Sequence, residues 1–137
     1  MPRSASSSFG TSARCWRGGR RSTRPTGRDC RAFPGIRCLD FAGDGAANYA
    51  YFPILVGPDY PIGRDALYDA LKRDGIHPRR YFYPLISDHA MYRTLPSARR
   101  EDLPVASAAA DRVLCLPIYP DLDPAVIARI VRRIAQP

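Results

Sequence analysis

The sequence predicts an α+β fold: a small domain with a short, mainly antiparallel sheet and helices on one face. A chain of 137 residues is long enough for one modest hydrophobic core, so a single domain is expected. Segments with strand-like and helix-like apolar patterns alternate between residues 48 and 134. The strand-like segments are too few for a doubly wound sheet, which leaves the smaller architecture.

The first predicted strand covers Asn48–Val56 and is rich in aromatic and branched side chains. Its alternate residues from Ala50 to Val56 are apolar and share one face. Pro53 lacks the backbone N–H that a strand ladder needs, so it implies an edge strand or a bulge. Residues 57–61 contain a glycine and two prolines and are expected to form a turn.

The next segment, Arg64–Asp74, has the pattern of an amphipathic helix. Gly63 is an acceptable N-cap, and Gly75 is a typical helix stop. Residues 76–81 are then expected to form a short strand. The apolar stripe of the helix consists of Ala66, Leu67, Ala70 and Leu71.

A second helix is expected to begin at Leu103–Pro104, because proline suits the first turn of a helix. Its inward side chains are expected to be Val105, Ala109 and Val113. The apolar run Val113–Leu116 predicts a third short strand, which is ended by the prolines that follow it.

The last helix is predicted from Asp123–Pro124, since aspartate is a good N-cap and proline a good first helical residue. The segment after it is amphipathic. Its apolar stripe comprises Val126, Ile127, Ile130, Val131 and Ile134, and its polar face carries Arg129, Arg132 and Arg133.

The segment Arg79–Leu85 combines three aromatic rings, two adjacent guanidiniums and a proline. It is too aromatic for a solvated loop and too charged for plain core. If the segment is extended, Tyr81 and Tyr83 share one face and Phe82 points the other way. These side chains are therefore candidates for a binding site.

Together with residues 48–54 and 114–120, this segment resembles the C-terminal part of the DegT/DnrJ/StrS family. Those proteins are nucleotide-sugar aminotransferases that depend on pyridoxal phosphate (PLP) and have the fold of the aspartate aminotransferase superfamily. The resemblance covers Phe33 to Ile134 and implies the small C-terminal domain of that fold for residues 34–137. It also implies a homodimer that transfers an amino group, usually from glutamate, to a keto-sugar on a nucleoside diphosphate. The form of the aromatic segment resembles the subgroup that acts on thymidine-diphosphate 4-keto-6-deoxy sugars for surface polysaccharides.

Aminotransfer by PLP needs a lysine that holds the cofactor as a Schiff base. Lys72 is the only lysine of the chain, and it lies on the charged face of a predicted helix. In the family, the catalytic lysine and the phosphate cradle belong to the large domain, upstream of the segment matched here. The resemblance therefore implies a C-terminal fragment that holds no PLP alone, has no catalytic residue of its own and is inactive without a large domain.

Five side chains are candidates for contact with the substrate, the first of them by the resemblance. Tyr81 stands where many relatives carry a histidine facing the sugar, and Tyr83 shares its face. Arg79 and Arg80 are expected to pair with the diphosphate, because guanidinium binds phosphate oxygens bidentately. Tyr49 is a candidate to reach the site from the first strand, and packing is its favoured alternative. The alternatives are packing for the tyrosines and salt bridges or an exposed edge for the arginines.

The net charge of +8 is concentrated in residues 1–33, which hold eight arginines against the single acid Asp29. This segment has no apolar periodicity and is expected to be a disordered basic tail. A transit peptide, an RNA-binding arm and an artefact of a shifted reading frame or start site are its three interpretations, and the last is favoured. Residues 34–137 carry nearly balanced charge, which argues against a nucleic-acid partner for the folded part.

The four cysteines lack the spacing of a zinc site, and Cys115 lies in an apolar run that predicts a buried free thiol. No segment has the length of a membrane span, so the cytoplasm is the expected location. Without a large domain, rings such as Tyr49, Tyr81 and Phe82 are expected to lie partly in water. The rival hypothesis is a non-enzymatic binding module, either a basic-tailed nucleic-acid binder or a partner of a separate large-domain chain.

Overall fold

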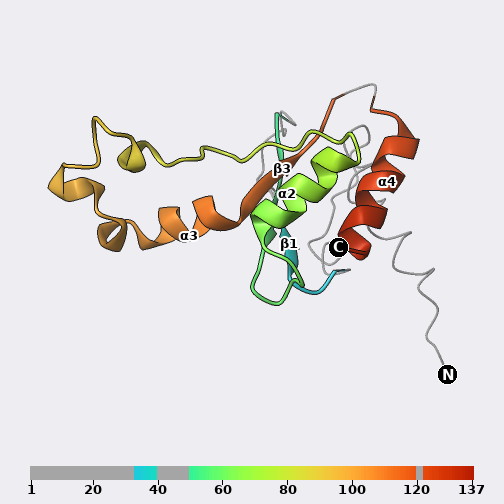
Figure 1. The fold of residues 1–137 in the computed structure, drawn as a ribbon, viewed down its shortest axis with the longest axis horizontal. Helices are drawn as coiled ribbons and strands as arrows, with labels where there is room; N and C mark the ends of the chain where they lie inside the picture. The colour runs from blue at the N-terminus through green and yellow to red at the C-terminus, as the bar shows by residue number, and fades with distance from the viewer. Residues whose placement is uncertain (1–32, 40–49, 120–121) are drawn as a thin grey trace, which may run out of the picture.

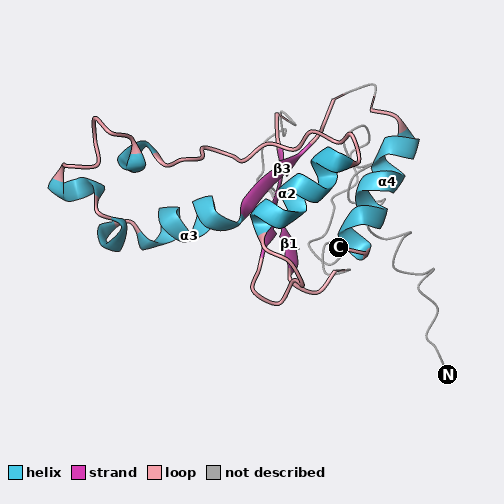
Figure 2. Ribbon diagram, in the orientation of Figure 1, coloured by secondary structure: helices cyan, strands magenta, loops and turns pink. Residues whose placement is uncertain are grey.

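The computed structural model describes residues 33–39, 50–119 and 122–137 (Figure 1). The basic tail (all of residues 1–33 but Phe33) and the start of the predicted strand, Asn48 and Tyr49, therefore lie outside the described residues. In chain order the elements are β1 (Ile36–Cys38), β2 (Phe52–Val56), α2 (Arg64–Arg73), α3 (Pro104–Arg112), β3 (Val113–Leu116) and α4 (Pro124–Ala135), with three single 3-10 turns between α2 and α3 (Figure 2).

Within the described ranges the sheet has three strands in the order β1-β2-β3, and both pairings are antiparallel. Ile36 lies opposite Val56 in the first pair, and Phe52 lies opposite Leu116 in the second. The predicted α+β fold with a short antiparallel sheet is thus confirmed. The sequence analysis missed β1, because three residues are too few to show an alternating pattern.

The prediction that Pro53 marks an edge strand or a bulge was wrong, because β2 is the central strand and its pairing with β3 continues without a bulge through Pro53. The strand tolerates the proline for a geometric reason. Cys115, opposite Pro53, exchanges both of its backbone hydrogen bonds with Arg79 on the far side. Pro53 therefore directs its nitrogen away from β3, toward the side on which β1 has already ended at Cys38. No ladder hydrogen bond is lost at that position.

The hydrophobic core lies between the sheet and the pair α2 and α4, which contact each other (Figure 1). On α2, Leu67 and Leu71 are completely buried, whereas Ala66 of the predicted stripe is exposed. The longest helix, α4, has 12 residues, and no helix in the described ranges is long and apolar enough to cross a bilayer. The fully buried side chains of the core are Ile54, Leu67, Leu71, Leu114 and Ile130.

The predicted start and stripe of α4 are confirmed. The carboxylate of Asp123 accepts a hydrogen bond of 2.8 Å from the backbone N–H of Ala125, which makes it a true N-cap. Ile127, Ile130, Val131 and Ile134 are buried, and Val126 packs against them at the edge.

The loop after β2 contacts both the segment before β1 and the end of α4. The phenol of Tyr60 is buried and donates a hydrogen bond of 2.8 Å to the carbonyl oxygen of Ile134, at the end of α4. Gly35 has a φ of +78° and lies so close to this loop that a Cβ atom would approach the backbone nitrogen of Tyr60 to 2.1 Å. Only glycine fits this position without a shift of the backbone.

Two further predictions were wrong. Residues 76–81 do not form a strand, because Pro78 has no N–H to donate and a single bridge joins Arg79 to Cys115. Val105 and Ala109 do not face inward either: both are exposed, and of α3 only Ala110 is buried. The reason is that α3 belongs to a segment that projects away from the core (Figure 1). The periodicity of a helix predicts an apolar face, but it does not say whether another part of the chain packs against that face.

Candidate functional site

The aromatic segment is a turn rather than an extended strand. Its start is held by the bridge between Arg79 and Cys115, with backbone hydrogen bonds of 2.9 and 2.8 Å. Phe82 has a φ of +46°, and the peptide bond between Tyr83 and Pro84 is cis. The segment is therefore not extended, and the expectation that Tyr81 and Tyr83 share a face was wrong: the ring of Tyr81 packs against Tyr51, whereas that of Tyr83 lies beside Arg64 and Arg80.

Tyr81 belongs to a small group of aromatic rings. Its ring meets that of Tyr51 edge-on, with centroids 4.9 Å apart, and lies 4.2 Å from that of Phe82. Tyr81 is half-buried, whereas Phe82 is 68% exposed. This group joins the start of β2 to the turn and presents an apolar ring face to solvent.

Arg80 and Tyr83 belong to a second group, built on α2. The guanidinium of Arg80 lies over the rings of Tyr68 and Tyr83, at 4.2 and 5.5 Å from their centroids. Its Nε atom lies 2.8 Å from the carboxylate oxygen Oδ1 of Asp65. The charge of Arg80 is thus held in place by α2, which corresponds to the salt-bridge alternative.

The centre of this second group is Arg64, which the sequence analysis did not single out. Its side chain is buried, and its Nη1 atom donates to the carbonyl oxygens of Ala110 and Val113 at 2.9 and 3.2 Å. Its Nε atom also lies 2.8 Å from Oδ1 of Asp65, and its guanidinium lies 4.7 Å from the ring centroid of Tyr83. The same oxygen of Asp65 therefore forms ion pairs with both Arg64 and Arg80. Neither Nε atom has the geometry of a hydrogen bond to it.

The five predicted substrate residues are thus distributed unevenly. Arg80 and Tyr83 share one group, Tyr81 is in the other, and Tyr49 lies outside the described residues. The side chain of Arg79 is exposed, although its backbone is fixed. The burial of Arg64 had no signal in the sequence, since it occupies the first turn of a helix, where charged residues are usually solvated.

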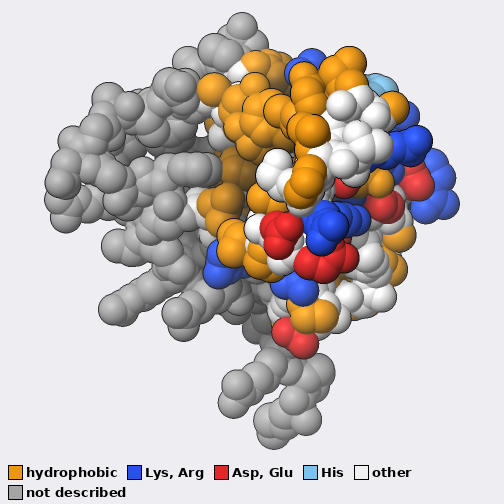
Figure 3. All heavy atoms as spheres, turned by 90° about the vertical axis from the view of Figure 1, so that its left-hand side faces the viewer, with side chains coloured by type: hydrophobic (Ala, Val, Ile, Leu, Met, Phe, Trp, Pro, Cys, Tyr) orange, Lys and Arg blue, Asp and Glu red, His pale blue; other side chains and the backbone are white. Residues whose placement is uncertain are grey.

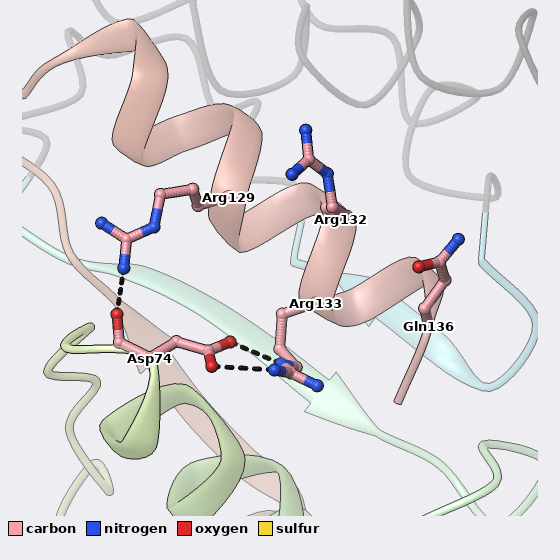
Figure 4. Close-up of a pocket in the computed structure, with 5 residues that line it drawn as sticks. All are labelled: Asp74, Arg129, Arg132, Arg133 and Gln136. Atoms are coloured by element: carbon pink, nitrogen blue, oxygen red, sulfur yellow. Dashed lines mark hydrogen bonds and ion pairs between the residues drawn. The ribbon is translucent and has the colours of Figure 1, made fainter.

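A separate hollow lies between the C-terminal ends of α2 and α4 (Figure 4). It is lined by Asp74, Arg129, Arg132, Arg133 and Gln136. Arg133 forms a bidentate pair with Asp74, at 2.5 and 2.8 Å, and Arg129 donates to the backbone carbonyl of Asp74. The hydrogen bond from Arg133 lowers the pKa of Asp74 below its ordinary value. Arg132, which also lines the hollow, points away from Asp74 (Figure 4). These contacts hold the C-terminal end of α2 against α4. Arginines are favourable there, because the C-terminal end of a helix carries a partial negative charge.

The fold defines the class of protein. The structure resembles that of a putative PLP-dependent aminotransferase from Bacillus cereus ATCC 10987, with a TM-score of 0.59 and 17% sequence identity. The similarity covers 96% of this chain and 30% of that one. The architecture is thus that of one part of an aminotransferase.

The sequence then identifies the family. Residues 28–135 match the model of the DegT/DnrJ/EryC1/StrS aminotransferase family, and the chain belongs to this family. It is 46% identical over 99 residues to a dTDP-4-amino-4,6-dideoxy-D-glucose transaminase of Escherichia coli, and 38% identical over 102 residues to one of Shigella dysenteriae. These matches cover 72% and 74% of this chain but only 27% of each relative. The family resemblance inferred from the aromatic segment is confirmed.

The family depends on PLP, a cofactor that aminotransferases hold as a Schiff base on a lysine. Lys72, the only lysine of the sequence, is exposed on α2, and its Nζ atom lies 5.3 Å from the ring centroid of Tyr68. A Schiff-base lysine needs a desolvated or electrostatically tuned pocket. Within the described part of the chain, no group of three or more His, Cys, Asp or Glu is placed to hold a metal ion either.

Proposed function

We propose that this chain is the C-terminal part of a PLP-dependent aminotransferase that acts on a dTDP-linked 4-keto-6-deoxy sugar in amino-sugar biosynthesis, and that it is inactive alone. The observation that carries this proposal is the 46% identity to the E. coli transaminase over a segment that spans 27% of that relative. The single lysine, Lys72, supports the second half of the proposal, because it is exposed and a Schiff-base lysine needs a desolvated or electrostatically tuned pocket.

In the complete enzyme, which we take to be a homodimer in the cytoplasm, residues 34–137 would form the small domain. Tyr81, Tyr83, Arg79, Arg80 and Tyr49 are proposed to face the nucleotide-sugar. The exposure of the Arg79 side chain supports a role in binding the diphosphate. Arg80 is held by Asp65, so its proposed role is to orient the ring of Tyr83 as much as to contact the ligand.

The test is direct. The purified chain is mixed with PLP, glutamate and a dTDP-4-keto-6-deoxy sugar, and the amino-sugar product is measured by mass spectrometry. No product is expected, and after dialysis no visible absorbance of a Schiff base should remain. Turnover by the chain alone, or an absorbance that disappears in Lys72→Ala, would contradict the proposal. Lys72→Arg is the matched control, because it keeps the charge beside Tyr68 and removes only the amine.

A further inference from the structure

The hollow between the C-terminal ends of α2 and α4 is built mainly from one side of α4 (Figure 4). Four of its lining residues have the spacing i, i+3, i+4 and i+7, which places them on one side of this helix: Arg129, Arg132, Arg133 and Gln136. Asp74, the C-cap of α2, lies across from Arg129 and Arg133. The hollow has a volume of about 270 Å³. Sites for small molecules usually measure about 300–1,000 Å³, so this one has room for a small ligand only.

The lining of the hollow has an excess of positive charge. It contains three guanidiniums, and its only carboxylate is that of Asp74. Besides the hydrogen bond from Arg133, the charges of Arg133, Arg129 and Arg73 lower the pKa of Asp74, so Arg73 adds to the positive potential of the same place. The C-terminal ends of the two helices contribute only about half a negative charge each. They and Asp74 therefore do not cancel the four arginines.

This excess produces repulsion along α4. Arg129 lies three residues before Arg132 and four before Arg133, and like charges at these spacings destabilise a helix. On the face of the molecule in Figure 3, by contrast, several Lys and Arg side chains lie beside Asp or Glu side chains. Arg100 and Asp111, at 3.0 Å, are an ion pair of this kind. An anion in the hollow would relieve the repulsion along α4 as a carboxylate does elsewhere.

Two of the three guanidiniums are already held in place. Arg133 is fixed by its bidentate pair with Asp74, and Arg129 by the backbone carbonyl of that residue. A guanidinium has five N–H donors, of which these contacts use two on Arg133 and one on Arg129. The other donors remain available, and little side-chain freedom is left to lose on binding. Arg132 and the amide of Gln136 are exposed and add further donors.

We propose that this hollow binds a small oxyanion of the phosphate class, either free phosphate or diphosphate or a phosphate group of a larger molecule. Guanidiniums form bidentate, charge-assisted hydrogen bonds with phosphate oxygens. A phosphate also offers more charge and more oxygens to three guanidiniums than a monocarboxylate does. None of the lining residues belongs to the aromatic segment, so this inference does not rest on the proposed function.

The experiment titrates the full 137-residue chain with inorganic phosphate, diphosphate and acetate at constant ionic strength. Binding is measured by calorimetry and by the Nε–H signals of the arginines in nuclear magnetic resonance spectra. Diphosphate should bind saturably with a dissociation constant of about 1 mM or lower. Phosphate should bind more weakly than diphosphate, and acetate more weakly still.

Two variants remove donors from the hollow. Arg132→Gln should weaken diphosphate binding at least about threefold, and Arg129→Gln/Arg132→Gln at least about tenfold. Both variants keep the pair of Arg133 with Asp74, which holds α2 against α4. Arg132 points away from Asp74, so the single variant should also keep the circular dichroism spectrum and melting temperature of the parent (Figure 4).

The basic segment of residues 1–33 requires a control, because its eight arginines also attract anions. Arg20→Gln/Arg21→Gln removes two charges from that segment. Arg99→Gln/Arg112→Gln removes two from exposed positions of the described chain. Both controls have the same net charge as the double variant of the hollow, and both should keep the diphosphate affinity within about twofold of the parent. Equal losses in the controls and in the double variant would show a general attraction to a basic chain and overturn the proposal.

Titration with dTDP distinguishes the two sources of the phosphate. If Arg132→Gln weakens dTDP and diphosphate binding alike, the hollow accepts a phosphate group of a larger molecule. If only the inorganic anions bind there, the ligand is free phosphate or diphosphate, and either result supports the site. Absence of saturable phosphate binding, or acetate bound as tightly as diphosphate, overturns the proposal. Diphosphate binding that is lost in Arg79→Gln but kept in Arg132→Gln also overturns it, and would instead support the role proposed above for Arg79.

Discussion

The guanidinium of Arg64 closes the C-terminal end of α3, because its Nη1 atom lies 2.9 Å from the carbonyl oxygen of Ala110. The last carbonyls of a helix have no partner within the helix, and here a residue 46 positions earlier supplies one. The same guanidinium also reaches Asp65 and the ring of Tyr83. One buried side chain thus connects α2, the end of α3 and the aromatic turn.

Replacement of Arg64 should therefore be costly. Arg64→Met keeps much of the side-chain volume but leaves the carbonyl oxygens of Ala110 and Val113 without their charged donor. We expect a loss of about 2–3 kcal/mol in the free energy of unfolding, measured by urea denaturation. Arg112→Met, an exposed arginine of α3, should change it by less than about 0.5 kcal/mol. Equal effects of the two substitutions would show that Arg64 has no special structural role.

Three glycines allow backbone strain and crowding to be separated. Gly35 has both a positive φ and a close neighbour, Gly75 has a positive φ of +73° in open space, and Gly63 has neither. We expect Gly35→Ala to cost about 3 kcal/mol or more and Gly75→Ala about 1–2 kcal/mol, while Gly63→Ala stays within about 1 kcal/mol of the parent. The ranking is read from thermal and urea unfolding. A stable Gly35→Ala variant would contradict the close approach of Gly35 to Tyr60.

The pair of Asp74 and Arg133 predicts a dependence of stability on pH. Arg133 lowers the pKa of Asp74 in the folded chain, whereas an unfolded aspartate has a pKa of about 3.9. The contribution of Asp74 to stability is therefore fully present above the unfolded pKa, and it is lost as the pH falls through the folded pKa. Asp74→Asn should be less stable than the parent at pH 7 and should approach it near pH 2.

The measurement is urea unfolding of both proteins between pH 2 and 7. Asp69→Asn, on the exposed side of α2, is the control and should follow the parent closely. If the difference between Asp74→Asn and the parent stayed constant over this range, the pair would not contribute in the way described.

Burial raises the pKa of the Cys115 thiol to about 11. At pH 8 only about one thiol in a thousand would be the reactive thiolate, and the side chain is also inaccessible. Iodoacetamide should therefore label Cys115 only in denaturant, whereas the half-buried Cys38 reacts faster in the native chain. Peptide mass spectrometry identifies the labelled site. Because the folded pKa is raised, stability should also fall as the pH rises above the unfolded value of about 8.5.

Much of the fold was predictable from local patterns. β3 was predicted with its observed bounds, Val113–Leu116, and α4 begins at the predicted cap Asp123. The stripe of α4 and the helix stop at Gly75, whose φ is +73°, were also predictable. These features depend on residues close together in the chain, so their signals survive in the sequence.

The candidate site was predictable only in part. The sequence pointed to the aromatic segment as a site, but not to its partners, because Tyr51, Arg64 and Tyr68 reach it from other elements. The turn at Tyr81 and Phe82 was also missed, since alternation along a segment indicates a face only when the segment is extended.

By itself, the sequence determined the class of fold, the family and most helix and strand positions, because periodicity, caps and short motifs are local properties. The tertiary structure alone decided that β2 is central, that Arg64 is buried and that residues 80–112 leave the core. Each of these depends on contacts between residues far apart in the chain. A side chain is buried only if another element packs against it, and an apolar pattern in the sequence does not identify that element.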